Sequence, residues 1–405
     1  MPSPSPEAQS EQRRKRLYLL FALFGGGAGW ISTTLAFMQV PIYQRHFTGL
    51  SLSNRLALGY NLGTLPAALW VLALWTGWRP SKRSSSIYAL LTVQLAAVAC
   101  LLVAVPGSPL FSVGFLAFAQ FLGGACGYCS QFVCVPYLVS TFENELVGAF
   151  LTGDAAASVL AALIALVQEP ASRPPRFGLA AYVALAGLPI ILASVAACVH
   201  IERTGAGRLP EDASRRLIES EADAPSGVKP FWLEPLTWKL GLVVFWSQFA
   251  DWGVGDSVYP YACANADTGG VERCEMWSNE LSLAAQLVGC AVASRIALNA
   301  DRLTATLWVP VAIYTGWFAL LLVTSWAGSS KTPRLDERGV LVDLFVLRGL
   351  GPYARAVVPR LIQPCYDRRH HESLPVFFGV LAVVGNVSGS LVATGLIGAK
   401  QFGTR

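Results

Sequence analysis

Ionisable side chains occur inside long apolar stretches of this sequence. Asp154, Asp251 and Arg355 are each flanked by hydrophobic runs, and Arg348 lies seven positions before Arg355. Seven residues make nearly two helical turns, so the two arginines share one face of a helix. Placing a charged side chain at the centre of the bilayer costs about 2.5–3.5 kcal/mol. Such residues are therefore retained where they bind substrate, line a water-filled path or form an ion pair. We expect Asp154, Asp251 and Arg355 to be functional; for the two arginines, the other interpretation is that they extend toward the membrane surface.

Neutral polar and aromatic side chains share these segments. Amides and hydroxyls inside a membrane either join helices by hydrogen bonds or bind a polar ligand. Aromatic rings such as those of Trp30, Phe37, Trp252 and Tyr259 offer flat faces for a planar ligand, although packing explains most single rings. The predicted substrate-binding residues are Trp30, Thr34, Gln39, Asn61, Gln131, Asp154, Gln286 and Arg355.

The composition shows which elements must position these residues. Of 405 residues, 54% are hydrophobic and 14% are charged, whereas about 25% are charged in a soluble domain. A helical span needs about 20 apolar residues. The sequence therefore predicts an all-α polytopic membrane protein with about eleven spans, near residues 17–43, 55–77, 87–105, 110–139, 146–168, 177–200, 238–259, 277–298, 303–325, 340–363 and 374–398.

A long polar loop divides these spans into a group of six and a group of five. It is rich in Glu, Asp, Ser and Pro, as linkers between bundles are. This organisation is typical of a major-facilitator-like or equilibrative-nucleoside-like carrier, which binds its substrate between the bundles. The predicted parts are a disordered cytosolic tail (1–16), an N-terminal six-helix bundle (17–200), a cytosolic linker (201–237), a C-terminal five-helix bundle (238–398) and an external tail (399–405).

Basic residues predict the orientation in the membrane. The run Arg13–Arg16 and the basic segments 78–86 and 363–373 fall on one side under this span count, and short cytosolic loops are rich in Lys and Arg. We therefore expect a cytosolic N-terminus and an extracellular C-terminus. Cys263 and Cys274, with ten residues between them, fall in a predicted outside loop, where oxidising conditions favour a disulfide.

Several blocks of the sequence resemble the riboflavin transporter family. From Trp30 to Pro41 the spacing matches the family's first-span signature, with Thr34 in place of Asn, Phe37 in place of Trp and Gln39 in place of Glu. Further resemblance, in the same order along the chain, is found at Tyr60–Gly63, Ser130–Gln131 with Pro136–Tyr137, Gly153–Asp154 with Ala165–Gln168, Ser257–Cys263, Tyr353 with Arg355, and Gly385 with Gly389. Trp252 and Val383 depart from the family pattern at polar positions.

This resemblance implies a plasma-membrane carrier that takes up riboflavin by alternating access. The flat ring and hydroxylated chain of riboflavin require aromatic faces and neutral hydrogen-bonding groups. A carrier of another flat heterocycle, such as a nucleoside or a different vitamin, would use the same scaffold. A non-transporting cell-surface receptor is the other alternative, but its ligand-binding exterior would need longer outside loops than these.

Other function classes find no support in the sequence. Walker, zinc-binding and nucleophile motifs are missing, so we expect neither an enzyme nor a bound cofactor or metal. The net charge of +5 reflects basic loops rather than a nucleic-acid surface. The expected partners are a small-molecule substrate and the lipid bilayer, with no nucleic acid and no obligatory protein partner.

Overall fold

The computed structural model describes most of the chain, in segments separated by short gaps. The described residues are 6–47, 51–76, 83–172, 174–208, 230–266, 271–296, 303–326, 335–367, 370–371 and 373–398. These segments are helical, with turns and an isolated β-bridge between Phe142 and Arg208. The predicted external tail over residues 399–405 and most of the predicted linker lie outside the described residues.

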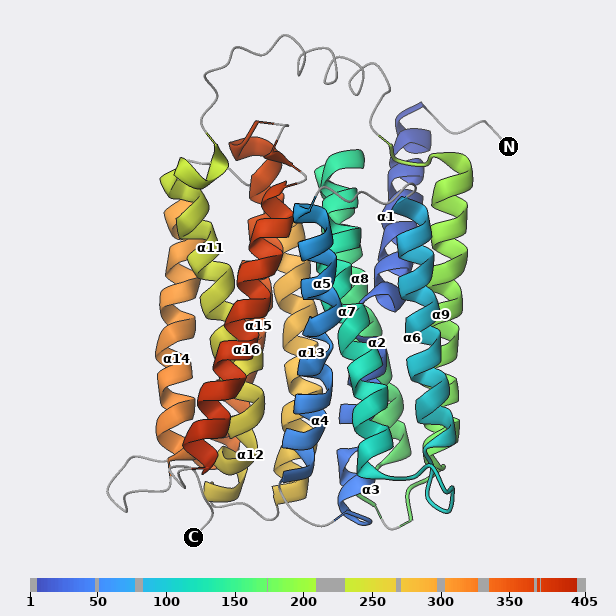
Figure 1. Ribbon diagram of the computed structural model, residues 1–405, viewed down its shortest axis with the longest axis vertical. Helices are drawn as coiled ribbons and strands as arrows, with labels where there is room; N and C mark the ends of the chain where they lie inside the picture. The colour runs from blue at the N-terminus through green and yellow to red at the C-terminus, as the bar shows by residue number, and fades with distance from the viewer. Residues whose placement is uncertain are drawn as a thin grey trace.

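The helices form two groups that stand side by side in Figure 1. The N-terminal half contains α1 (Pro6–Ala28), α2 (Ile31–Phe37), α3 (Val40–Gln44), α4 (Ser51–Leu62), α5 (Thr64–Trp75), α6 (Arg83–Val103), α7 (Val113–Thr141), α8 (Asn144–Gln168) and α9 (Leu179–Thr204). The C-terminal half contains η1 (Phe231–Leu233), α11 (Pro235–Gln248), η2 (Phe249–Gly255), α12 (Asp256–Asn265), α13 (Val271–Arg295), η4 (Thr304–Trp308), α14 (Val309–Ser325), α15 (Glu337–Cys365) and α16 (Ser373–Gly398).

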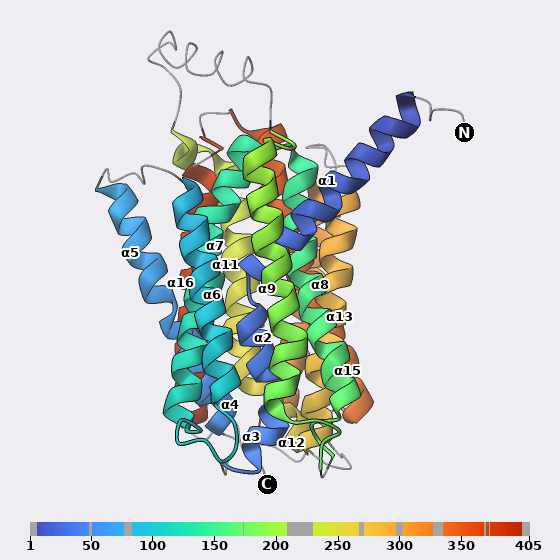
Figure 2. The same cartoon turned by 90° about the vertical axis from the view of Figure 1, so that its right-hand side faces the viewer.

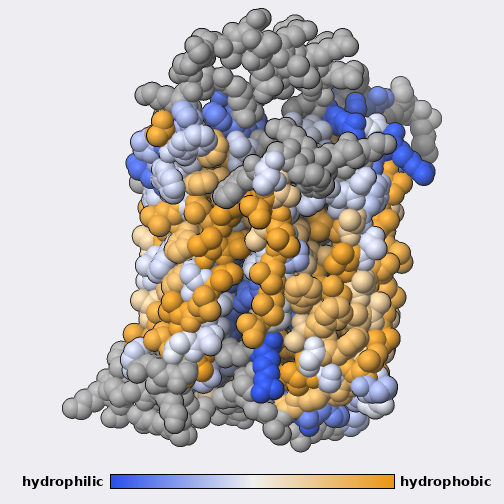
Figure 3. Space-filling model, in the orientation of Figure 1, coloured by the Kyte–Doolittle hydropathy of each residue, from blue (hydrophilic) through white to orange (hydrophobic). Residues whose placement is uncertain are grey.

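Apolar side chains cover the middle of the molecule on the face that Figure 3 shows, between two more hydrophilic ends. Large apolar side chains such as Leu69, Leu192 and Leu391 are exposed on the protein surface. Among the described residues, seven helices are long and apolar enough to cross a membrane, or eight if the bent pair α1 and α2 is one span. The prediction of a polytopic, all-helical membrane protein is confirmed.

Each half packs mainly within itself, and a few helices join the two. In the N-terminal half α1 contacts α8 and α9, and α7 contacts α4 and α6. In the C-terminal half α13 packs against α15, and α16 packs against α11 and η2. The principal contacts between halves are α8 with α13 and α7 with α16. The interface between the halves therefore follows these two helix pairs.

The first predicted span is broken near its middle. Helices α1 and α2 meet at an angle of 58° around Gly29 and Trp30. The glycine-rich segment before the break has weak helix propensity. It also allows close packing, since a Cβ on Gly25 would lie 2.0 Å from the carbonyl oxygen of Phe150 in α8. The break places Trp30 at the centre of the molecule rather than on a continuous helix.

The prediction of a disordered tail over residues 1–16 is wrong for residues 6–16. Helix α1 already begins at Pro6, and Figure 2 shows its first turns projecting beyond the other helices. Good helix formers dominate this segment, and Lys15 pairs with Glu11 one turn away at 2.7 Å. Both bounds of the predicted linker, 201–237, are also displaced. The prediction starts too early, because α9 continues to Thr204, and it ends too late, because α11 begins at Pro235.

Candidate functional site

A cavity lies between the two halves near the middle of the molecule. The empty space at this site, together with the open solvent at its mouth, amounts to about 620 Å³. The N-terminal half contributes side chains from the break after α1 and from α2, and the C-terminal half contributes side chains from η2, α12, α13 and α15. The lining residues are Trp30, Thr33, Thr34, Phe37, Met38, Trp252, Asp256, Tyr259, Ser278, Asn279, Ser282, Leu283, Gln286, Leu344 and Arg348.

Two tryptophans from opposite halves border this cavity. The indole rings of Trp30 and Trp252 are nearly parallel, with 9° between their planes and 6.4 Å between their centroids. Trp30 is further held by edge contacts with Tyr60 and Tyr128, whose ring centroids lie 6.2 and 4.9 Å away. Parallel aromatic faces bind flat rings by stacking. The cavity therefore presents two stacking surfaces, one belonging to each half.

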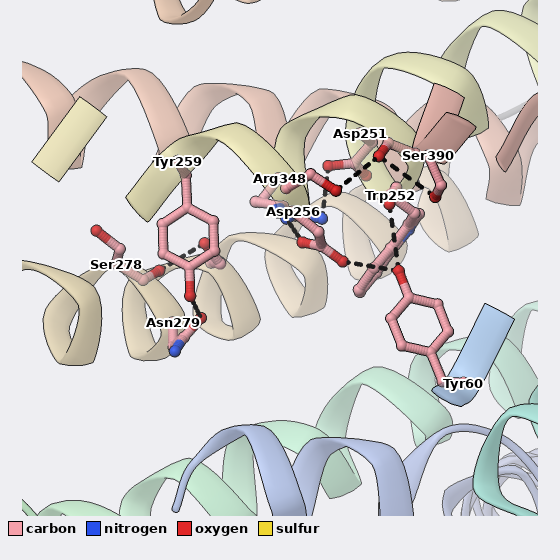
Figure 4. Close-up of polar contacts among 12 residues, drawn as sticks. Tyr60, Asp251, Trp252, Asp256, Tyr259, Ser278, Asn279, Arg348 and Ser390 are labelled. Carbon is pink, nitrogen blue, oxygen red and sulfur yellow. Dashed lines mark hydrogen bonds and ion pairs between the residues drawn. The ribbon is translucent and has the colours of Figure 1, made fainter. Parts of the chain in front are cut away.

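A group of four charged residues lies beside Trp252. Arg348 contacts Asp251 at 2.8 Å and also pairs with Asp256, while Arg355 contacts the second oxygen of Asp251 at 3.1 Å. Figure 4 shows Arg348 between the two carboxylates, next to the indole of Trp252. Because two carboxylates face two guanidinium groups, the formal charges of the group cancel. Such compensation is required for charges removed from water.

The two arginines also interact with the ring of Trp252. The guanidinium carbon of Arg348 lies 4.6 Å from the ring centroid, and that of Arg355 lies 5.7 Å away. A cation over an indole face contributes about 2 kcal/mol when water is excluded. These contacts fix the plane of Trp252 from the C-terminal half.

A π-helical segment brings Asp251 and Trp252 to the cavity. Helix α11 passes into η2 over Phe249–Gly255, and α12 continues directly from Asp256. Wider π turns interrupt an α-helix locally and are frequent at functional sites. In this segment Asp251 faces the arginines of α15, while the Trp252 ring faces the N-terminal half. Ser390 of α16 lies behind the turn and donates a hydrogen bond to the carbonyl oxygen of Gly253 at 3.4 Å.

Helices α7 and α8 hold Trp30 in the N-terminal half. The backbone N–H of Trp30 donates a hydrogen bond to Oδ1 of Asp154 at 3.1 Å. On α7, a Cβ on Gly127 would lie 2.4 Å from the indole of Trp30, so only glycine leaves room for the ring at this position. Asp154 is thus a positioning residue for Trp30, and it does not line the cavity.

Solved membrane transporters share this architecture. The Escherichia coli fucose:proton symporter FucP aligns over 96% of this chain and 92% of its own, with a TM-score of 0.54 and 15% identity. A second FucP structure, in the outward conformation, covers 95% of this chain and 91% of its own, with a TM-score of 0.58 and 13% identity. This chain has the major facilitator fold. A bacterial homologue of the human lysosomal transporter Spinster, inward-facing and occupied, aligns over 98% of this chain and 84% of its own, with a TM-score of 0.50 and 14% identity.

Sequence comparison adds nothing to this structural likeness. No protein-family model matches the chain, and no curated protein matches it. The prediction of a major-facilitator-like architecture is confirmed by the structures, whereas the resemblance to riboflavin transporters remains a hypothesis about substrate.

The structure brings some of the predicted site residues together and separates others. Trp30, Thr34 and Gln286 line the cavity. Arg355 lies behind it, in the charged group. Gln39 instead donates to Oε1 of Gln168 at 2.8 Å within the N-terminal half. Gln131, on α7, is partly buried and is not among the lining residues.

Asn61 belongs to a separate polar contact between the halves. Its amide donates to the hydroxyl of Ser390 at 2.9 Å, and its carbonyl accepts from Tyr128 at 2.8 Å. Asn386 of α16 donates to the same Tyr128 hydroxyl. Asn61 therefore joins α4 and α7 to α16.

Several lining residues were missed by sequence reasoning. Ser278, Asn279 and Ser282 lie in the polar first half of α13, which the sequence prediction placed at the edge of a span. Together with Gln286 they recur at intervals of three and four residues, the spacing of one helical face. That spacing is the signal that would have assigned them to one polar wall. Tyr259 of α12 donates to Asn279 at 3.1 Å and orders this wall, as Figure 4 shows.

Contacts between the halves occur on both sides of the cavity. Toward the end where α1 begins, Gln363 of α15 donates to the carbonyl oxygens of Val139 and Phe142 at 3.1 and 3.3 Å. Toward the opposite end, Gln44 donates to Glu275 of α13 at 3.3 Å. Beside the cavity, the Tyr60 hydroxyl reaches Asp256 at 3.1 Å and the carbonyl oxygen of Trp252 at 3.2 Å.

The disulfide residues lie next to one another near the end of α12 and the start of α13. Cys263 and Cys274 have their Cα atoms 5.7 Å apart and are joined through their sulfur atoms. The bond connects two helices that both supply cavity residues.

Proposed function

We propose that this protein is a plasma-membrane carrier that moves riboflavin by alternating access of the central cavity. The observation that supports this best is the pair of nearly parallel indoles of Trp30 and Trp252, one from each half. A flat ring bound against both faces would contact both halves at once. Rocking of one half against the other then exposes the cavity to either side in turn.

The polar lining also suits riboflavin. Thr34, Asn279, Ser282 and Gln286 offer neutral hydrogen-bonding groups around the cavity, as a hydroxylated chain requires. The charged group beside Trp252 has no formal net charge, which favours an uncharged substrate over an ion. Arg348 reaches the cavity and can donate to a carbonyl oxygen on the edge of a heterocycle.

Uptake of labelled riboflavin into proteoliposomes tests this proposal. Purified protein should give saturable uptake that empty liposomes lack. Trp252→Ala removes one stacking face and should raise the apparent KM about tenfold, equivalent to about 1.4 kcal/mol. Trp232→Ala is the matched control, because Trp232 is 53% exposed at the edge of the molecule. Uptake equal to that of empty liposomes would contradict the riboflavin assignment.

Another flat heterocycle remains the second candidate, since the two indoles recognise ring planarity rather than a particular ring. Excess unlabelled nucleosides and other heterocyclic vitamins should be added to the same uptake assay. Strong competition by one of them, with weak competition by unlabelled riboflavin, would transfer the assignment to that compound. Competition by riboflavin alone supports the proposal.

A further inference from the structure

A buried carboxyl of α13 has no partner among the described residues. Glu280 is only 7% exposed, and neither of its carboxyl oxygens has a hydrogen-bond partner in the described part of the chain. Its neighbour Glu275, five residues earlier, is by contrast bonded to Gln44. An ionised carboxylate without a cation or donor costs several kcal/mol at such a place. Glu280 is therefore stable there as the neutral acid.

Helical geometry directs Glu280 toward the N-terminal half. Nine residues, or two and a half turns, separate it from Gly289, and Gly289 packs against the α15 backbone at Gly349. Glu280 thus lies on the side of α13 opposite α15. Leu283, one turn further, packs in the same buried cluster as Leu35 and residues of α8 and α9. The carboxyl is accordingly part of the interface between the halves.

A second unpartnered group lies in the same region. Tyr182 of α9 is an electrostatic neighbour of both Glu280 and Tyr43. The Tyr43 hydroxyl is completely buried and, within the described residues, has no hydrogen-bond partner. Tyr182 itself donates to the carbonyl oxygen of Ala161 at 3.2 Å. Tyr182 of α9 therefore lies near two buried groups without a described hydrogen-bond partner, the Tyr43 hydroxyl of α3 and the Glu280 carboxyl of α13.

The other ionisable groups around α13 are engaged elsewhere or face away. In α8, Asp154 accepts from Trp30, and in α12 Asp256 pairs with Arg348 and Tyr259 bonds Asn279. In α15, Arg348 and Arg355 are held by Asp251. Asp343 of α15 is a second fully buried carboxyl without a described partner. It belongs to the helix that packs on the opposite side of α13 from Glu280.

We propose that Glu280 is the site of a co-transported proton in this carrier. On the side where substrate enters, Glu280 binds a proton, and the loaded carrier closes with the neutral acid. On the side where substrate leaves, the halves separate, water reaches the carboxyl and the proton leaves to that solution. Ionised Glu280 disfavours closure, so substrate crosses only with the proton, and the empty carrier returns slowly without it. This inference rests on the proposed carrier function. It assigns the proton to a residue outside the cavity lining and distinct from the charged group beside Trp252.

Transport in proteoliposomes tests the coupling. With an acidic exterior and a gradient of one pH unit, one proton per substrate drives accumulation of labelled riboflavin up to about tenfold. Glu280→Gln imitates the neutral acid and should abolish accumulation while exchange of labelled for unlabelled riboflavin continues. Asp343→Asn is the matched control and should accumulate riboflavin as the wild type does. Normal gradient-driven accumulation by Glu280→Gln would overturn the proposal, as would loss in Asp343→Asn alone.

A substrate-free measurement separates this inference from the riboflavin assignment. Met38 lines the cavity, so Met38→Cys reports its opening through the rate of maleimide labelling. Each rate is divided by that of an exposed thiol, Trp232→Cys, because the thiolate that reacts with maleimide becomes more abundant as pH rises. This ratio should increase with pH in the Met38→Cys protein and should become independent of pH when Glu280→Gln is added. A pH dependence of the ratio that survives Glu280→Gln would contradict the proton site even if riboflavin proves not to be the substrate.

Discussion

The two halves of the molecule differ in how apolar their helices are. Described helices of the N-terminal half qualify as spans almost without exception, whereas α14 and α16 alone qualify among those described in the C-terminal half. The C-terminal helices that fail include α12, α13 and α15, which line the cavity. Low hydropathy in these helices thus marks the site.

The chemistry differs in the same way. The N-terminal half presents Trp30, Thr33, Thr34 and Phe37, which are aromatic or neutral, to the cavity. The C-terminal half presents Trp252 together with charges that compensate one another. An apolar half can move past lipid cheaply, while the charged half needs its pairs intact. Substitutions should therefore damage the C-terminal half more severely than the N-terminal half.

The largest effect is expected from Arg348. Arg348→Ala leaves Asp251 and Asp256 facing each other with one buried cation fewer, which should lower the free energy of unfolding by about 3–5 kcal/mol. Thermal unfolding of the purified protein measures this loss, with exposed Arg203→Ala as the control. Equal stability of the two variants would show that the charged group does not support the C-terminal half.

Asp154 tests the corresponding support in the N-terminal half. Asp154→Leu removes the acceptor for the Trp30 N–H and should weaken riboflavin binding by about 1–3 kcal/mol. Asp154→Asn retains an oxygen acceptor and should bind nearly as well as the wild type. Titration of each purified variant with riboflavin measures both. If Asp154→Leu binds riboflavin with wild-type affinity, Asp154 does not position Trp30 for binding.

Gly127 tests the placement of the ring itself. Gly127→Ala introduces a Cβ that overlaps the indole of Trp30, so the ring must tilt, and riboflavin affinity should fall about five- to tenfold. Gly114→Ala, on the same helix, is the control because a Cβ there meets nothing within 4 Å. If the two alanine variants bind alike, the orientation of Trp30 does not determine affinity.

The smallest effect concerns a hydrogen bond between the halves. Tyr60→Phe removes the O–H that reaches Asp256 and should change the balance between closed and open states by about 0.5–1.5 kcal/mol. Tyr314→Phe removes a bond within the C-terminal half, to the carbonyl oxygen of Ser247 at 3.1 Å. Maleimide labelling at Met38→Cys should accelerate with Tyr60→Phe and not with Tyr314→Phe. The reverse order would contradict a role of Tyr60 between the halves.

Hydropathy and span length were sufficient to predict the helical membrane fold. They could not predict the break at Trp30 or the π-helical turn at Trp252, because both depend on packing between distant segments. The site was predicted in part: Trp30, Thr34 and Gln286 were chosen for their polarity or flatness inside spans. Gln39 is also a polar residue inside a span. It bonds to Gln168, which is distant in the sequence, so the residue type alone could not show that Gln39 lies outside the cavity lining.

Equilibrium binding of riboflavin to purified wild-type, Trp30→Ala, Trp252→Ala and Trp232→Ala proteins tests the central claim that both halves share one stacking site. We expect Trp30→Ala and Trp252→Ala each to weaken binding about tenfold, and Trp232→Ala to bind as the wild type does. Wild-type affinity in either cavity variant would show that the substrate does not lie between the two indoles.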